Sequence, residues 1–287
     1  MSVRGRGATL PRVVAAEWTK LTSLRSTWWA ALASVAASAA LTYLSADASS
    51  GDPGYDPLGD LTAGLMLTQL GPLVLGVLAG TGEFSTGGFR TTFVAVPWRR
   101  RVLAAQTAAV AGFALLVAVA SVVAAVLAIL PAASSRNLPV NLTEGSTPRE
   151  LAGMVLLLTG LALFGLAVGA LVRRVVPALV TVVGLTLILP VVLTLAVEPG
   201  GSTFVEPGGS TFVEGVTPQE TVVNTITTLL PSGAGGLLVT SSGAFAMPGA
   251  PDLGAVGGGL VLAAWALAPL AAAALRLRLR LRLEDVT

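Results

Sequence analysis

The chain has 287 residues, of which 54% are hydrophobic and only 11% charged, and its formal net charge is +2. A soluble domain normally carries about 25% charged residues, so this composition indicates an integral membrane protein. The sequence holds no cysteine and no histidine, which excludes a thiolate nucleophile, a Cys or His metal site, a Ser-His triad and a disulfide framework.

The first predicted element is an amphipathic helix over residues 10–26, LPRVVAAEWTKLTSLRS. Apolar residues recur in it at helical spacing, and basic residues are available for the opposite side. These residues are Val14, Trp18 and Leu21, and Arg12, Lys20 and Arg25. Such a helix lies on the membrane surface before the first span, either as a plain anchor or as a contact for a partner.

Six apolar segments then approach or exceed the ~20 residues with which a helix crosses a bilayer. They cover residues 27–45, 61–80, 102–130, 151–172, 175–197 and 255–275. Trp28, Trp29 and Tyr43 lie near the ends of the first segment, as an aromatic belt predicts. Ala46-Asp47-Ala48 has the form of a signal-peptide cleavage site, but the apolar run before it is longer than a leader's, so we expect the span to be retained. We predict an all-α integral membrane protein with six transmembrane helices in one domain, residues 1–287.

Glycine and proline positions predict how the spans pack and bend. Gly76-x-x-x-Gly80 and Gly165-x-x-x-Gly169 allow another helix backbone to approach closely, although such spacings are common in a chain with 33 glycines. Pro190 predicts a kink in the fifth span, because it cannot donate a backbone hydrogen bond. The third segment is longer than a bilayer requires, so its helix starts in the cytoplasm or tilts.

Three connections are expected on the outer side. Residues 46–60 form an acidic loop rich in Gly and Pro, and residues 131–149 form a loop with three prolines. Residues 198–254 form the third connection, which begins with the octet EPGGSTFV repeated twice in succession. Two copies are too few for a solenoid, so a local duplication in a tolerant loop is the expected explanation.

The third connection also contains a predicted short helix, residues 217–231. Thr217 and Glu220 have the spacing of a capping box, Pro218 suits the first helical position, and Pro231 is expected to end the helix. At about 13 residues the helix is too short to cross a bilayer. It therefore lies at the outer surface or dips into the membrane and returns.

Basic residues predict the orientation. All but two of the 17 Lys and Arg residues lie at the two chain ends or in alternate connections, and the opposite connections hold only Arg136 and Arg149. The positive-inside rule therefore predicts that both termini are cytoplasmic. Residues 81–101, TGEFSTGGFRTTFVAVPWRRR, then form a cytoplasmic loop.

This cytoplasmic loop has two interpretations. Glu83 and Arg90 are seven residues apart and share one face of a helix, and nearby glycines permit sharp turns. Taken alone, the arginines favour a loop that anchors the membrane edge through lipid phosphates, because arginine clusters beside spans are the rule. The only lysine, Lys20, lies in EWTKL, so the chain has no Walker A loop and any ATP hydrolysis needs another subunit. The basic residues are spread over short segments, so we expect no nucleic-acid partner.

The predicted spans contain no Asp, Glu, Lys or Arg. Carriers driven by protons or sodium usually bury such groups in the membrane, so their absence argues against a self-powered carrier. It also argues against an intramembrane protease, which needs a catalytic pair in mid-span. Mild polarity remains at Gln69, Thr181 and Thr186, which we predict to lie on a substrate path.

From about Glu17 to Val286 the chain resembles the permease subunits of bacterial ABC type-two, exporter-type transporters. The resemblance rests on four segments in order around six spans. These are EWTKLTSLRSTWW, GEFSTGGFRTTFVAVPWRRRVLAAQ, LLPSGAGGLL and a basic tail that ends in LEDV. The sequence departs from the family pattern at Gln106, where a lysine is expected, and in the duplicated octet.

The resemblance implies a six-helix permease in the bacterial plasma membrane that pairs with a second permease copy, as a homodimer or a related heterodimer, and with an ABC ATPase subunit. ATP and Mg would bind the partner ATPase, and this chain would hold no cofactor and no catalytic residue. The loop after the second span would include a coupling helix, a role that carries onto Glu83, Phe84, Gly87, Arg90 and Thr91. The amphipathic start would be an elbow helix with further contacts at Glu17, Lys20 and Arg25. Residues 217–238 would correspond to an outer re-entrant hairpin.

The sequence thus predicts an ATP-driven export permease of unspecified cargo. Two other classes stay open. One is a channel or secondary carrier that works without ATP, and the other is a membrane-embedded sensor or scaffold that recruits a cytoplasmic partner and moves nothing.

Overall fold

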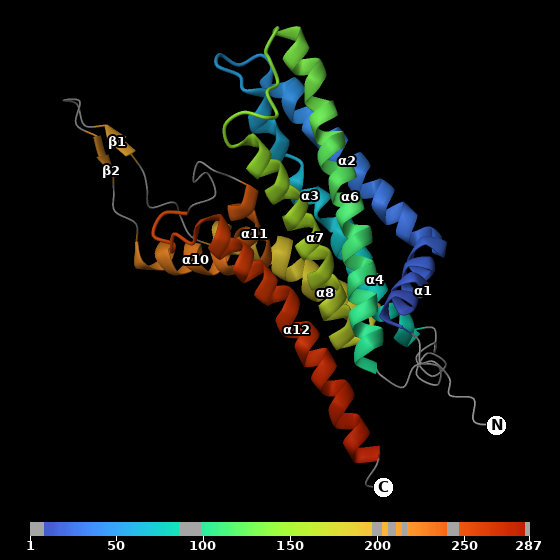
Figure 1. Ribbon diagram of the computed structural model, residues 1–287. Helices are drawn as coiled ribbons and strands as arrows, with labels where there is room; N and C mark the ends of the chain where they lie inside the picture. Colours follow the sequence, from blue (N-terminus) through green and yellow to red (C-terminus); the bar gives the residue numbers. More distant parts are fainter. Residues whose placement is uncertain are drawn as a thin grey trace.

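The computed structural model describes residues 9–85, 99–196, 203–205, 211–213, 217–239 and 247–284 (Figure 1). Its helices are α1 Leu10–Ser23, α2 Arg25–Ser49, η1 Pro57–Thr62, α3 Leu65–Thr68, α4 Leu70–Ser85, α6 Arg99–Ser135, α7 Thr147–Val172, α8 Val175–Val183, η2 Gly184–Ile188, α9 Leu189–Leu195, α10 Pro218–Leu229, α11 Pro231–Val239 and α12 Gly254–Glu284. Two short strands, β1 Thr203–Val205 and β2 Thr211–Val213, lie between α9 and α10.

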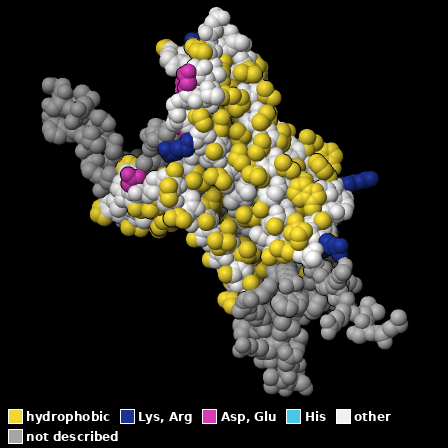
Figure 2. Space-filling view, viewed as in Figure 1, with side chains coloured by type: hydrophobic (Ala, Val, Ile, Leu, Met, Phe, Trp, Pro, Cys, Tyr) yellow, Lys and Arg dark blue, Asp and Glu magenta, His cyan; other side chains and the backbone are white. Residues whose placement is uncertain are grey.

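Within these ranges, six helical segments are long and apolar enough to cross a membrane. They are Arg25–Ser49, Pro57–Gly82, Val102–Ser135, Thr147–Val172, Val175–Leu195 and Gly254–Arg276. The predicted all-α membrane protein with six spans is confirmed at this level. Hydrophobic side chains cover most of the face shown in Figure 2, and the few charged ones visible there lie near its edges.

The fourth span, α7, is the central helix of the bundle (Figure 1). It packs against α4, α6, α8, α11 and α12. The side chains of Leu158, Leu161 and Phe164 are almost fully buried and belong to the main apolar core. A helix that is apolar on every side and surrounded by other helices is the expected centre of a membrane bundle.

Two spans extend further than hydropathy predicts. α2 continues to Ser49, into the expected loop 46–60, and α6 continues to Ser135, so that Pro131 lies inside the helix. The expectation that residues 131–149 form a loop throughout was therefore wrong at both ends, because α7 also begins inside this range, at Thr147. Pro131 lies in the last turns of α6, where the hydroxyls of Ser134 and Ser135 donate to the carbonyls of Pro131 and Ala132 at 2.8 and 2.7 Å and so satisfy carbonyls that the helix end leaves without a backbone donor.

Two other spans are interrupted. The second begins as the short helices η1 and α3 before α4, and the Asp56 side chain caps η1 by accepting from the amide of Leu58 at 3.1 Å. The fifth span contains the π-helical segment η2, which ends two residues before Pro190. The irregularity predicted at Pro190 is thus a widened helical turn directly ahead of it, as occurs where backbone bonding is disturbed.

The repeated octet supplies both strands. β1 and β2 pair antiparallel, with Thr203 opposite Val213, Phe204 opposite Phe212 and Val205 opposite Thr211. Each strand is the TFV triplet of one octet, so the duplication yields two identical segments that pair with each other. The third connection therefore contains a β-hairpin-like ribbon that its Gly-Pro-rich composition did not predict.

Candidate functional site

Glycines on α4 and α7 bring these two helices into close backbone contact. A Cβ atom at Gly76 would collide with the carbonyl oxygen of Ala162, and one at Gly80 would collide with that of Leu166. From the other side, a Cβ atom at Gly165 would lie 2.5 Å from the carbonyl oxygen of Leu73. The two predicted Gly-x-x-x-Gly spacings therefore face each other and bring the two backbones into contact.

The helix pair α10 and α11 is bent by 78° between the fifth and sixth spans. Thr217 caps α10, because its hydroxyl accepts from the amide of Glu220 at 3.2 Å, which confirms the predicted N-cap. Leu230 adopts extended backbone at the bend, and Pro231 begins α11. Pro231 thus ends one helix, as predicted, and also starts the next.

A tryptophan of the sixth span fixes this bend. The indole Nε1 of Trp265 on α12 donates to the carbonyl oxygen of Leu229, the last residue of α10, at 2.8 Å. The Trp265 ring also meets the edge of Phe164 on α7, with ring centroids 5.7 Å apart. The bend is therefore tied to both the sixth span and the central helix, a role for Trp265 that the sequence did not indicate.

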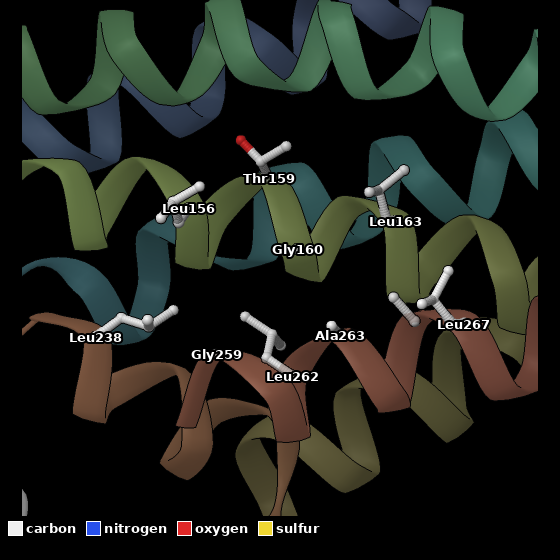
Figure 3. Close-up of a pocket in the computed structure, with 10 residues that line it drawn as sticks. Leu156, Thr159, Gly160, Leu163, Leu238, Gly259, Leu262, Ala263 and Leu267 are labelled. Atoms are coloured by element: carbon white, nitrogen blue, oxygen red, sulfur yellow. The ribbon is translucent and has the colours of Figure 1, made fainter. Parts of the chain in front are cut away.

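An apolar hollow of about 320 Å³ lies between α7, α11 and α12 (Figure 3). Leu156, Gly160 and Leu163 contribute from α7, Leu238 from α11 and Leu262 from α12. The side chain of Leu262 points towards Gly160, where a Cβ atom would lie 2.7 Å from it. The hollow has the size of a small-molecule site but is apolar apart from Thr159, whose hydroxyl bonds to its own helix at 2.8 Å.

The residues predicted for a substrate path do not share this hollow. Gln69 lies at the junction of α3 and α4, and its buried amide donates to the Met66 carbonyl at 3.0 Å. On the fifth span, Thr181 is exposed and Thr186 is buried. Each of these hydroxyls donates to a carbonyl four residues earlier in its own helix. All three polar groups therefore hydrogen-bond to backbone carbonyls of their own helical segments in this arrangement.

A line of buried hydroxyls on the first span joins it to the second and third spans, and this feature was missed. Ser38 on α2 donates to the Ser121 carbonyl on α6 at 2.8 Å, and Ser34 donates to the Thr68 carbonyl at 3.1 Å. The sequence signal was the spacing of Ser34, Ser38 and Thr42, which places three hydroxyls on one helical face. Side-chain hydrogen bonds of this kind hold membrane helices together.

The amphipathic helix α1 packs mainly against α6. Its innermost residues are Val13, Glu17 and Leu21, so its buried face is turned slightly from the predicted Val14, Trp18 and Leu21. The Trp18 ring lies against Phe113, with centroids 6.0 Å apart. The helix is therefore docked on the bundle along one side.

The three predicted elbow contacts have different surroundings. Glu17 is 5% exposed, and its carboxylate accepts from Lys20 Nζ at 2.5 Å. Lys20 and Arg25 are exposed, and Arg25 begins α2. Lys20 and Arg25 are therefore accessible to a protein partner at this surface, whereas Glu17 is buried.

The predicted coupling residues are only partly within the described ranges. The backbone of Glu83 and Phe84 belongs to the last turn of α4. Gly87, Arg90 and Thr91 lie outside the described residues. The described part shows one continuous helix from Leu70 through Gly76 and Gly80 to Ser85.

In the described part of the chain, no three Asp or Glu side chains are grouped as a metal site would require. Comparisons with protein families, with curated proteins and with solved structures find no match to this chain.

Proposed function

We propose that the chain is the membrane-spanning permease subunit of an ATP-driven exporter in a bacterial plasma membrane. In this proposal it pairs with a second permease copy and with a separate ABC ATPase subunit, which binds ATP and Mg. The chain itself performs no chemistry and forms the substrate pathway. The proposal starts from the sequence resemblance, and four structural features support it.

The observation that carries the proposal is the 78° bend between α10 and α11, in the segment between the fifth and sixth spans. The resemblance expects a re-entrant hairpin in this part of the chain. A bent pair with a buried bend suits an element that enters the outer leaflet and returns, because irregular backbone in a membrane must be covered by protein. Trp265 supplies part of that cover by bonding to the Leu229 carbonyl.

A second supporting feature is the position of α1. This amphipathic helix precedes the first span directly, since only Leu24 separates it from α2. The end of α4, the start of α6, helix α1 and the C-terminal end of α12 all lie towards the same end of the bundle (Figure 1). Most of the basic residues fall in these segments, so the positive-inside rule assigns this end to the cytoplasm.

The third feature is a mechanical connection from the proposed coupling loop to the bundle centre. Helix α4 runs without interruption from Glu83 back to Gly80 and Gly76, which touch the backbone of α7. Packed cores do not deform continuously, so a displacement of the loop by the ATPase would move α4 and α7 against each other as rigid elements. In the mechanism that we propose, this movement switches the pathway between inward-open and outward-open arrangements and also involves the fifth span.

The fourth feature is the contact set of α7. The same helix that receives α4 also packs against α11 and α12. At Gly153, a Cβ atom would collide with the carbonyl oxygen of Leu238 on α11. Movement of α7 would therefore reach the bent pair directly, which links the proposed cytoplasmic drive to the proposed outer gate.

Co-purification tests the proposal. The full chain, expressed together with a separate ABC ATPase subunit that carries a Walker A loop, is expected to retain that subunit and to change its ATPase rate. Replacing Glu83 and Arg90 together by Ala should abolish retention, because both would face the partner from one helical side. The matched control replaces Arg136 and Glu144 by Ala, which removes one charge of each sign from an exposed outer connection.

The outcomes separate the three classes. If the Glu83 and Arg90 variant associates and transports as the parent chain does, the coupling role is refuted. Transport by the purified chain alone, driven by an ion gradient in vesicles, would replace the proposal with an ATP-independent carrier or channel. Partner binding without any substrate movement in the reconstituted complex would identify a scaffold or sensor.

A further inference from the structure

The fifth span is built from three segments, and the middle one is irregular. α8 runs from Val175 to Val183, α9 runs from Leu189 to Leu195, and η2 between them is a π-helical turn. In that turn the amide of Leu189 donates to the carbonyl oxygen of Gly184, five residues earlier. Of the six spans in the described residues, the fifth also has the smallest buried share. It therefore receives the least packing support within this chain and is irregular near its middle.

Pro190 explains why the helix is weakened at this point. Proline has no amide hydrogen, so the carbonyl of Thr186, four residues earlier, receives no backbone hydrogen bond from it. The proline ring also interferes with the preceding turn, and this turn is the one that widens into η2. A helix that lacks a backbone hydrogen bond bends more easily there than elsewhere, and π-helical turns are frequent at functional sites.

The two halves of the span are attached to different parts of the molecule. α8 packs against α4 and α7, and its Ala178 and Val182 side chains are fully buried. α9 buries none of its side chains, and its main neighbour outside the span is α10. α4 and α7 carry the close glycine contact, whereas α10 is one arm of the bent pair. The irregular turn thus separates a half that is fixed to the bundle centre from a half that lies against α10.

We propose that η2 is a hinge about which α9 and α10 move together, while α8 stays fixed to α4 and α7. Hinges are a few residues that absorb changes in backbone angles between two bodies that move rigidly. η2 meets this description because the helices on its two sides contact different neighbours. The link from this hinge to an outer gate rests on the proposed function, in which the bent pair opens and closes. The hinge itself is a property of this chain and is measurable without the ATPase.

Distances between paired spin labels test the hinge in the full chain. The sequence has no cysteine, so two introduced cysteines carry the only labels. Leu127→Cys on α6 is the common reference, and it is paired with Val192→Cys on α9 or with Val180→Cys on α8. All three side chains are exposed, so the labels leave the packing undisturbed. With excess unlabelled chain to isolate distances within one copy, we expect a broad distribution for the α9 pair and a narrow one for the α8 pair.

Pro190→Ala should stiffen the hinge, because alanine restores an amide that can donate to the Thr186 carbonyl. The distribution of the α9 pair should become narrow. Amide hydrogen exchange in residues 191–195 should slow about fivefold, the factor that corresponds to about 1 kcal/mol for one hydrogen bond. Pro177→Ala is the matched control in the same span. Pro177 is the third residue of α8, where an amide has no acceptor within the helix, so both measurements should match the parent chain.

Three results would overturn the hinge. Equally narrow distributions for the two label pairs in the parent chain would show that α9 does not move relative to α8. A Pro190→Ala chain with the α9 distribution and exchange of the parent would show that the end of the span merely frays. An equal response to Pro177→Ala would show that the effect does not arise at η2.

Transport by the complex with the ATPase subunit separates this proposal from the proposed function. Pro190→Ala should still bind that subunit but lose transport, because the outer gate no longer opens. Transport at the parent rate would refute the link between the hinge and the gate. A parent chain that neither binds the ATPase nor transports would refute the proposed function, and the label distances would still decide whether η2 is a hinge.

Discussion

Gly76 of α4 lies so close to the carbonyl oxygen of Ala162 in α7 that not even a methyl group fits between them. In lipid, helices gain little from the hydrophobic effect by associating, so close backbone packing has to hold them together. This contact lies midway between the proposed coupling loop and the proposed outer gate. Its closeness therefore matters for stability and for any movement passed from α4 to α7.

Gly76→Ala is expected to destabilise the bundle. The methyl group would overlap backbone atoms, which cannot move aside as a flexible side chain can, and overpacking of this kind costs about 1–3 kcal/mol. Thermal unfolding of the full chain in detergent, followed by tryptophan fluorescence, measures the effect as a lowered Tm.

Gly82→Ala is the matched control in the same helix. A Cβ atom at Gly82 would have nothing within 4 Å, so the substitution adds a methyl group in open space. Alanine is the better helix former by about 0.5–1 kcal/mol, so the Tm should hold steady or rise. Equal losses at positions 76 and 82 would contradict the tight contact between α4 and α7.

Hydropathy was sufficient to predict six spans, because each apolar run has about the length that a bilayer requires. The residues at which the spanning helices begin and end were less predictable. α2 extends to Ser49, where the hydroxyls of Ser45 and Ser49 reach Asp60 Oδ1 at 2.6 and 3.5 Å. That contact depends on the fold of a later segment, so no local pattern marks it. Pro131 was expected to mark a loop, but it lies inside α6, five residues from the helix end at Ser135 counting both residues, where serine hydroxyls satisfy the carbonyls of Pro131 and Ala132.

The candidate site was predictable where the signal was local. The cap at Thr217 and the paired glycine spacings both follow from short sequence motifs. The roles of Trp265 and Arg276 do not, because each bonds to a carbonyl group of another helix, 36 and 105 residues earlier in the chain. Every residue has a backbone carbonyl, so the sequence does not indicate which residue accepts a hydrogen bond from Trp265 or Arg276.

Trp265→Phe should loosen the bend between α10 and α11. Phenylalanine keeps a ring beside Phe164 but loses the indole N–H that donates to Leu229. A neutral hydrogen bond contributes about 0.5–1.5 kcal/mol, and its loss should appear as faster amide hydrogen exchange in residues 226–230. Trp29→Phe provides the control, since Trp29 is 69% exposed. Unchanged exchange at the bend in the Trp265 variant would show that other contacts hold it.

Gln106→Glu should destabilise the chain more than Gln106→Met. The buried Gln106 amide donates from α6 to the Ala79 carbonyl on α4 at 2.8 Å. Methionine removes this bond at a cost of about 1 kcal/mol. An ionised glutamate has no donor and would place a buried charge against a carbonyl oxygen, which costs more. Thermal unfolding at neutral pH ranks the variants, and the reverse order would refute the assigned bond.

Tyr55 should resist ionisation in the folded chain. Burial raises its pKa above the ordinary value of 10.0, and the charges of Asp60 and Asp56 raise it further. Since the chain has two tyrosines, Tyr43→Phe leaves Tyr55 as the only source of tyrosinate absorbance. Titration of that variant should show ionisation above pH 10, and the denatured chain should titrate at the ordinary value.

The sign of the linked stability follows from the raised pKa. The folded chain favours neutral Tyr55, so its contribution is fully present below the unfolded pKa and is lost as the pH rises through the folded one. Asp60→Asn, added to Tyr43→Phe, should bring the folded pKa part of the way back towards 10.0, because the burial remains. A titration that Asp60→Asn leaves unchanged would mean that Asp60 does not contribute to the raised pKa of Tyr55 and that burial and Asp56 set it.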